Sequence, residues 1–142
     1  MLSLFSTNSI NRVSFEDVQY AILHPENFII VNTLVTTEQD CLIKNTLDYN
    51  EEESIINQLL LNYEYKSKHI IIYGKNCNDV TSEKKYYQIL KFGFKYVCLY
   101  SGGLFEWLTL QDIYGNDEFP TTSNIIDILK YKPNRSFTGR IK

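Results

Sequence analysis

Residues 69–107 read HIIIYGKNCNDVTSEKKYYQILKFGFKYVCLYSGGLFEW, and this stretch decides the fold. Its two short apolar runs, His69–Tyr73 and Tyr96–Tyr100, are typical of buried parallel strands. Between them, a polar loop leads into a predicted helix over about Val80–Phe92, and Gly93 stands where a glycine commonly ends a helix. A strand, a crossover helix and a second strand indicate an α/β protein with a mainly parallel sheet.

Segments upstream continue the same alternation. Ser14 and Asp17 have the spacing of a shortened capping box, which predicts a helix beginning at about Phe15. Phe28–Leu34 is a continuous apolar run, so we expect another buried strand there. The acids of Asp48–Glu53 then suit the positive end of a helix dipole, which predicts a further helix start. The whole pattern predicts helices on both faces of a central sheet.

A last helix is expected near the C-terminus. After Phe119-Pro120, Thr122 or Ser123 is the candidate cap, and the helix would carry Ile125, Ile126 and Leu129.

The chain has 142 residues with 14 bases and 17 acids, and its size and 44% hydrophobic content suit one globular domain. Residues 130–142 hold five bases and no acid, so residues 1–129 carry nine bases and a net charge of −8. We therefore expect an N-terminal arm at 1–12, a domain at 13–129 and a basic tail at 130–142. An acidic body argues against nucleic acid as a partner, except through the tail.

The cysteine and histidine content limits the chemistry. Cys41, Cys77 and Cys98 lack CxxC spacing and are odd in number, so neither a disulfide framework nor a zinc site is expected. With only two histidines, we expect no metal site and no cofactor. The thiols favour a reduced, intracellular location, and no apolar run is long enough to cross a membrane. The first residues also lack the basic region and cleavage site of a secretion signal.

Ligands of open α/β sheets bind beyond the carboxyl ends of the strands, and two loops occupy that place here. The candidate site residues lie in the loop after Tyr73 (Gly74, Lys75, Asn76, Cys77, Asn78 and Asp79) and in the loop after Tyr100 (Ser101, Gly102 and Gly103). The first loop precedes a helix, whose N-terminus binds anions or lowers a thiol pKa. Cys77 is therefore the candidate nucleophile, and the alternative is an ordinary loop cysteine.

The strand, loop, helix with Gly93-Phe94, second strand and Gly-Gly-x-x-x-Trp element at Gly102–Trp107 resemble the C-terminal half of a rhodanese-like domain. The likeness covers roughly residues 13–112. Residues 105–115 and 119–122 are also similar to a divergent subgroup found in large DNA viruses and some protists. The resemblance implies a three-layer α/β domain whose mainly parallel central sheet has about five strands.

The same resemblance implies a catalytic defect. Active members of the family place the nucleophilic cysteine first after the strand, where this chain has Gly74, and an arginine near the loop end, where it has Asp79. The family's second-strand Asp and Arg correspond to Asn32 and Leu34. The related phosphatases need an arginine six residues after the cysteine, and here that position is Glu83.

These departures favour a catalytically inactive domain that serves as a protein-interaction or structural module, with an unidentified protein partner. The alternative is an unconventional sulfurtransferase or persulfide carrier that uses Cys77. The expected location is the cytoplasm, or the host cytoplasm or virion if the source is a virus.

Overall fold

The computed structural model describes residues 9–137. Residues 1–8 of the expected arm and residues 138–142, which include the tail residues Arg140 and Lys142, lie outside the described part. In chain order the elements are β1 (Arg12–Val13), α2 (Phe15–Leu23), β2 (Phe28–Asn32), η1 (Thr36–Glu38), α3 (Tyr49–Leu61), β3 (His69–Tyr73), α4 (Val80–Lys91), β4 (Val97–Tyr100), α5 (Gly103–Tyr114) and η2 (Ile128–Tyr131).

The four strands form one parallel sheet in the order β1-β4-β3-β2. Strand β3 lies inside the sheet, with Ile71 paired to Ile30 of β2 and to Cys98 of β4. Parallel pairing brings the carboxyl ends of all four strands to one edge. The loops that follow Tyr73 and Tyr100 therefore lie side by side, because these two residues are themselves register partners.

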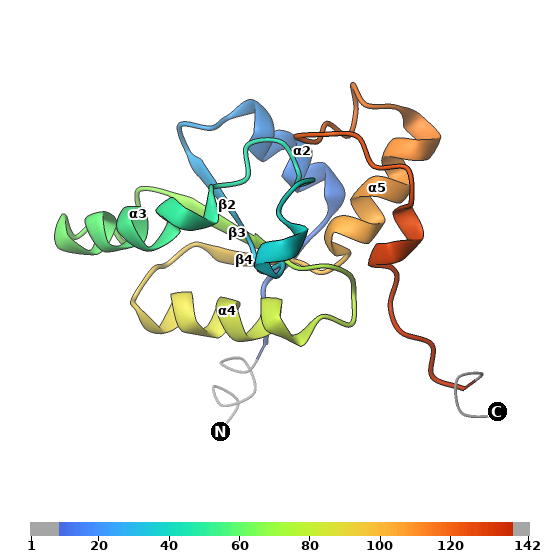
Figure 1. Cartoon of the computed structure of the whole chain (residues 1–142). Coiled ribbons are helices and arrows are strands. Elements are labelled where there is room, and N and C mark those ends of the chain that lie inside the picture. The colour runs from blue at the N-terminus through green and yellow to red at the C-terminus, as the bar shows by residue number, and fades with distance from the viewer. Residues whose placement is uncertain (1–8, 138–142) are drawn as a thin grey trace.

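Helices cover both faces of the sheet, so the predicted three-layer α/β fold is confirmed (Figure 1). Successive side chains of a strand point to opposite faces. Ile71 and Tyr73 thus pack with α2 and α5, whereas Ile70 and Ile72 pack with α3 and α4. This two-sided burial explains why β3 is apolar at consecutive positions rather than at alternate ones.

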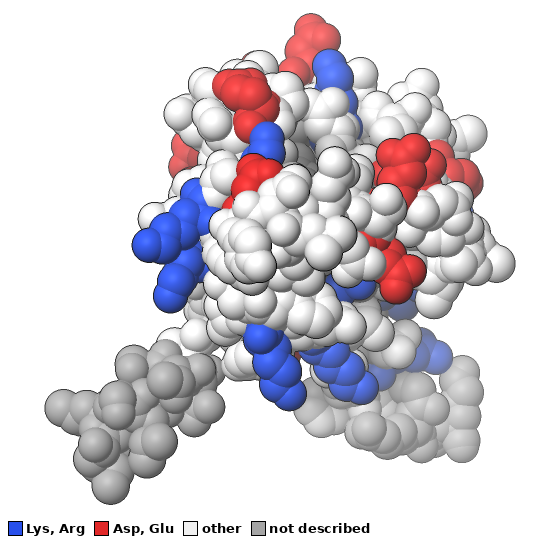
Figure 2. Space-filling view, turned by 90° about the vertical axis from the view of Figure 1, so that its left-hand side faces the viewer, with Lys and Arg blue, Asp and Glu red and all other residues white. Residues whose placement is uncertain are grey.

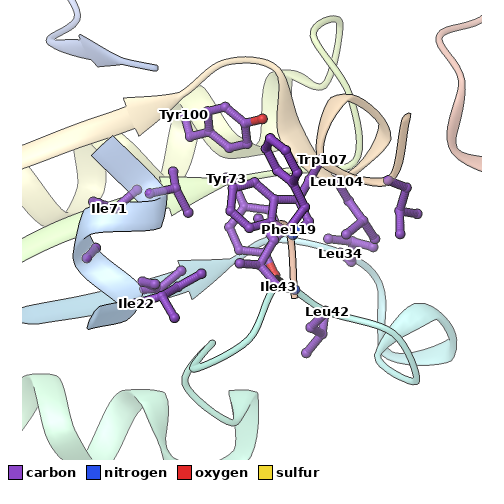
Figure 3. Packing of buried hydrophobic residues seen from close by; sticks show 14 of the residues in the cluster. Ile22, Leu34, Leu42, Ile43, Ile71, Tyr73, Tyr100, Leu104, Trp107 and Phe119 are labelled. Atoms are coloured by element: carbon purple, nitrogen blue, oxygen red, sulfur yellow. Dashed lines mark hydrogen bonds between the residues drawn. The ribbon is translucent and has the colours of Figure 1, made fainter. Parts of the chain in front are cut away.

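The core on the α2–α5 side is built around aromatic rings (Figure 3). Trp107 of α5 meets Phe119 edge to face, with ring centroids 5.0 Å apart, and its indole N–H donates to the Pro120 carbonyl at 3.1 Å. Tyr73 lies in the same cluster, and its hydroxyl accepts from the Ile43 N–H at 3.1 Å. The tryptophan of the Gly-Gly-x-x-x-Trp element therefore anchors α5 on the sheet.

Local signals explain the helix starts. Ser14 caps α2 in a capping box, with the Asp17 carboxylate accepting from the Ser14 N–H at 2.9 Å. Asp48 caps α3 by accepting from the Asn50 N–H at 2.9 Å. Both agree with the helix starts predicted from the sequence.

Two details differ from the expectation. The sheet of the described residues has four strands, close to the five or so expected, because the segment around Ile43 forms only isolated bridges, from Thr46 to Ile30 of β2 in parallel and from Ile43 to Thr121 antiparallel. The helix expected over Ile125–Leu129 is wrong: a short 3-10 helix, η2, stands there instead. Ile126 is 100% exposed and buries no surface, so packing does not stabilise a longer helix at that point.

The face of the molecule that Figure 2 shows, which is the left-hand side of Figure 1, carries both acidic and basic side chains. In Figure 2, Lys and Arg side chains lie mainly along the lower rim and the left of this face, and acids lie above and to the right, separated by uncharged residues. No continuous basic stripe, of the kind that follows a nucleic-acid backbone, crosses this view. Within residues 9–137, no helix is both long and apolar enough to span a membrane.

Candidate functional site

The candidate loop, residues 74–79, leaves the carboxyl end of β3 and ends at the start of α4, as the sequence predicts. Its last residue, Asp79, is the N-cap of α4. One carboxylate oxygen, Oδ1, accepts from the Thr81 N–H at 2.9 Å and from the Thr81 hydroxyl at 2.5 Å. The other, Oδ2, accepts from the Lys75 N–H at 2.8 Å. One carboxylate thus joins both ends of the loop.

The Asp79 carboxylate lies against Gly74, the position at which the resemblance expects a nucleophile. A Cβ atom placed on Gly74 would lie 2.5 Å from Asp79 Oδ2, 2.9 Å from its Cγ and 3.1 Å from the Ser82 Cβ. The first two distances are too short for any side chain to be added without moving Asp79. The space that a residue-74 side chain would enter is therefore occupied by an acid of the loop itself.

The start of α5 holds the loop from the other side. The Leu104 and Phe105 N–H groups donate to the carbonyls of Gly74 and Lys75, each at 2.9 Å. Gly103, with φ +68°, lets the two backbones meet: a Cβ there would lie 2.8 Å from the Gly74 oxygen and 2.9 Å from the Asn76 nitrogen. A helix N-terminus that elsewhere binds an anion is occupied here by carbonyls of the neighbouring loop.

Asn76 fixes the middle of the loop. Its side-chain amide donates to the Tyr131 carbonyl of η2 at 2.9 Å, and its Oδ1 accepts from the Asn78 N–H at 2.9 Å. The Asp79 N–H donates to the Asn76 carbonyl at 3.2 Å. Because Asn76 is largely buried, these bonds hold the loop to η2 and give it one shape.

The second loop has a similar arrangement. The Ser101 hydroxyl accepts from Arg12 Nη1 at 2.5 Å, which ties this loop to β1. The Glu106 carboxylate folds back over Gly102, where a Cβ would lie 2.4 Å from the Glu106 Cδ, and it accepts from the Tyr100 hydroxyl at 2.5 Å. Burial, together with this acid, raises the pKa of Tyr100 well above its ordinary value. An acid of the chain therefore lies over a glycine in each of the two loops.

A polar hollow of about 390 Å³ opens beside the first loop. Among the residues lining it are Thr33, Glu38, Lys75, Asn78, Asp79, Thr81, Lys132 and Asn134. The Lys75 ammonium, the only basic group of the loop, is paired with the Glu38 carboxylate at 3.0 Å. The hollow thus offers a free ligand neither an unpaired base of the loop nor the loop N–H groups that Asp79 already binds.

Cys77 is exposed, and it is not among the residues that line this hollow. Its thiol donates to the Asn78 side-chain oxygen, at 3.8 Å. The thiol is thus open to solvent and is not part of the hollow beside the loop. Whether Cys77 reacts stays a prediction.

The other two cysteines are buried. Burial is the main reason that the Cys98 pKa rises from 9.0 to about 11, with a smaller contribution from the Asp17 carboxylate. Burial also raises the pKa of Cys41, whose thiol contacts the Ser123 carbonyl at 3.4 Å. A raised pKa keeps both thiols protonated at neutral pH, so neither is an activated nucleophile.

The end of β2 is closed by its own residues. Asn32 is buried, and its Oδ1 accepts from the Leu34 N–H at 3.0 Å and from the Gln39 amide at 2.7 Å. The resemblance places an Asp and an Arg of active enzymes at Asn32 and Leu34. This chain has an internal amide network and a buried leucine there, and neither supplies a charge to the site.

Sequence reasoning missed the acids that complete the site, Glu38 and Glu106, and the tail residues Lys132 and Asn134. Glu38, Lys132 and Asn134 come from segments far from the loop in sequence, so no local signal marks them. Glu106 lies in the first turn of α5, directly after the second loop. Sequence reasoning also missed that Asp79 is an N-cap, although an aspartate directly before a predicted helix at Val80 is a recognisable signal.

Comparisons with known proteins bear on the fold alone. No protein-family model matches the chain, and no curated protein matches it either. Among solved structures, a yeast protein tyrosine phosphatase of the rhodanese family aligns with a TM-score of 0.59 and 14% identity, over 82% of this chain and 94% of that one. The single-domain sulfurtransferase RDL2 of Saccharomyces cerevisiae aligns with a TM-score of 0.56 and 17% identity, over 80% and 98%.

The Alr3790 protein from Anabaena aligns with a TM-score of 0.56 and 20% identity, over 83% of this chain and 97% of that one. The three alignments cover most of each chain, so the likeness extends over the whole domain. At these identities they speak for architecture and not for activity. The chain has the rhodanese-like fold.

Proposed function

We propose that this protein is a catalytically inactive domain of the rhodanese-like fold and that it serves as a protein-interaction or structural module. The observation that carries the proposal is the Asp79 carboxylate, which lies where a side chain at Gly74 would point. Its two oxygens accept the Lys75 and Thr81 N–H groups. In a catalytic loop, such N–H groups would stabilise a thiolate or a bound anion.

Charge supports the same conclusion. A negative charge beside a thiol raises its pKa and repels an anionic substrate. Asp79 supplies that charge beside position 74, and the ammonium of Lys75, the base of the loop, is paired with Glu38. The loop is thus built to be stable without a ligand.

Anion binding tests this proposal. We expect thiosulfate or sulfate to leave the thermal midpoint of the wild-type protein unchanged, apart from a general salt effect measured with chloride at equal ionic strength. In Asp79→Ala, the freed N–H groups should bind the anion, and the midpoint should rise with its concentration, since a ligand of the folded state stabilises it by mass action. Saturable stabilisation of the wild type would contradict the proposal.

The alternative is a persulfide carrier that uses Cys77, and the exposure of this thiol favours it. The Cys77 thiolate would attack the outer sulfur of a sulfane donor, whose S–S bond breaks as the rest of the donor leaves with the electron pair. An acceptor thiolate would then attack the outer sulfur of the Cys77 persulfide and release the Cys77 thiolate. Phosphatase chemistry is not proposed, because Glu83 stands where the arginine would be and pairs with Arg12.

The origin, location and organisation of the chain belong to the same proposal. The three free cysteines suit a reducing compartment, so we place the protein in the cytoplasm, or in the host cytoplasm or virion if its divergent subgroup is viral. The domain spans residues 13–129, between an N-terminal arm and a basic tail. Contact with nucleic acid is assigned to that tail alone.

A further inference from the structure

A second hollow lies outside the candidate site, between α5 and η2. We call it the α5–η2 groove, and its apolar residues include Phe105, Ile113, Ile126 and Leu129. Ile113 is 65%, Ile126 100% and Leu129 63% exposed. These three large aliphatic side chains lie at one hollow and together form an exposed apolar patch. Contiguous patches of this kind, unlike single exposed apolar residues, mark interaction sites.

Helix α5 itself indicates that something covers this side. It carries buried Leu104, Trp107 and Leu108 toward the sheet, and it also carries Phe105 and Ile113 toward the groove. A helix that is apolar around most of its circumference is typical of one that is packed on both sides. In the described residues, only its sheet-facing side is fully covered.

The rim of the groove is acidic. The two charged residues that line it, Asp112 and Asp127, come from α5 and from the residue before η2. Charge complementarity therefore favours an occupant that combines apolar side chains with Lys or Arg.

The chain contains such a segment. Residues 132–142 read KPNRSFTGRIK. They contain two large apolar residues, Phe137 and Ile141, and four bases. Phe137 is 80% exposed, so it is not packed on its own domain. Lys132 and Asn134 line the hollow beside the loop instead of the α5–η2 groove, and residues 132–137 run away from α5 in Figure 1. The described part of the tail therefore does not occupy the groove of its own domain.

We propose that the α5–η2 groove binds the basic C-terminal tail of a second copy of this chain, so that two chains exchange tails in a closed dimer. The apolar side chains of the tail fill the groove, and its bases pair with Asp112 and Asp127. Such an exchange uses the same patch on both subunits and closes with twofold symmetry. The inference rests on the interaction role proposed above and is independent of whether the loop is catalytic.

Light scattering coupled to size exclusion tests the dimer on the full chain. We expect a mass of twice 16.7 kDa at low salt, and a shift to the monomer at high salt because the rim charges are screened. Ile126→Asp should give the monomer in either salt without loss of fold, since that side chain is fully exposed. Leu61→Asp is the matched control: Leu61 is also an exposed aliphatic residue, but it lies on α3, so this variant should stay dimeric at low salt.

A labelled peptide of residues 132–142 identifies the occupant. We expect the peptide to bind the wild-type protein. It should bind the double variant Asp112→Lys/Asp127→Lys about tenfold more weakly, because two charge pairs at the rim of the groove are lost. A peptide with Arg135, Arg140 and Lys142 replaced by Glu should show the opposite preference. A monomer at all concentrations and salts, a dimer that Ile126→Asp leaves intact, or a peptide indifferent to the rim charges would each overturn the inference. The inactivity of the loop, measured by anion binding, would stand in all three cases.

Discussion

Replacing Asp79 by alanine removes the group on which the proposed function depends. The carboxylate caps α4 by accepting from the Thr81 N–H at 2.9 Å and from the Thr81 hydroxyl, and it accepts across the loop from the Lys75 N–H at 2.8 Å. Loss of an N-cap costs about 1 kcal/mol of the free energy of unfolding. A hydrogen bond to a charged acceptor contributes about 1.5 kcal/mol more at the low end of its range, which suits a partly exposed loop.

We therefore expect Asp79→Ala to lower the free energy of unfolding by about 2.5 kcal/mol. The chain offers a matched control in Asp48, which caps α3 through one bond to the Asn50 N–H and has no cross-loop contact among its hydrogen bonds. Asp48→Ala should cost about 1 kcal/mol. The difference between the two variants, about 1.5 kcal/mol, measures the bonds that Asp79 makes beyond its N-cap bond, to the Lys75 N–H across the loop and to the Thr81 hydroxyl.

Urea denaturation of the wild type and both variants, followed by tryptophan fluorescence, supplies the three free energies. Trp107 is buried against Phe119 and reports on the core rather than on either cap, so one probe serves all three proteins. Equal m-values would show that the same surface is exposed in each case. Equal losses for Asp79→Ala and Asp48→Ala would refute the reasoning, because the bonds that Asp79 makes beyond its N-cap bond would then contribute nothing.

Two further predictions concern backbone contact and pH. Gly103→Ala should lower the free energy of unfolding by about 3 kcal/mol or more, because the added Cβ would meet the backbone of Gly74 and Asn76. Gly115→Ala is the control: Gly115 also has a positive φ, but nothing lies within 4 Å of its Cβ position, so the variant should lose only about 1 kcal/mol. Equal losses in urea denaturation would show that the close approach of α5 to the loop is not formed. Because the folded-state pKa of Cys98 is raised to about 11, its contribution to stability is complete below its unfolded value of 9.0 and is lost as the pH rises toward 11. Denaturation midpoints at a series of pH values should fall less steeply in Cys98→Ala than in the wild type, and identical slopes would contradict this assignment.

Much of the fold follows from local sequence. The run His69–Tyr73 predicts β3 to the residue, and the Ser14 and Asp17 pair predicts the start of α2, because each signal is complete within a few residues. The expected strand over Phe28–Leu34 ends two residues early, at Asn32. There the Asn32 side chain binds the Leu34 N–H and turns the chain out of the sheet. Such a side-chain competitor for backbone bonds is visible in the sequence only as a single asparagine.

The site is less predictable because its parts meet through the fold. The place of the loop at the carboxyl edge followed from the order of strands and helices. The contact of Gly103 with the Gly74 carbonyl, and the bond from Asn76 to the Tyr131 carbonyl, join residues 29 and 55 positions apart. No spacing rule reports such pairs. The expected helix at residues 125–129 is wrong because two of its apolar residues, Ile126 and Leu129, are exposed rather than packed.

Sulfur transfer by the wild-type protein tests the central claim most directly. With thiosulfate as donor and cyanide as acceptor, the account predicts that thiocyanate forms no faster with the protein than without it. The account also predicts the same background rate for Cys77→Ser. Turnover by the wild type that disappears in Cys77→Ser and persists in Cys98→Ala would contradict the claim and establish Cys77 as a nucleophile.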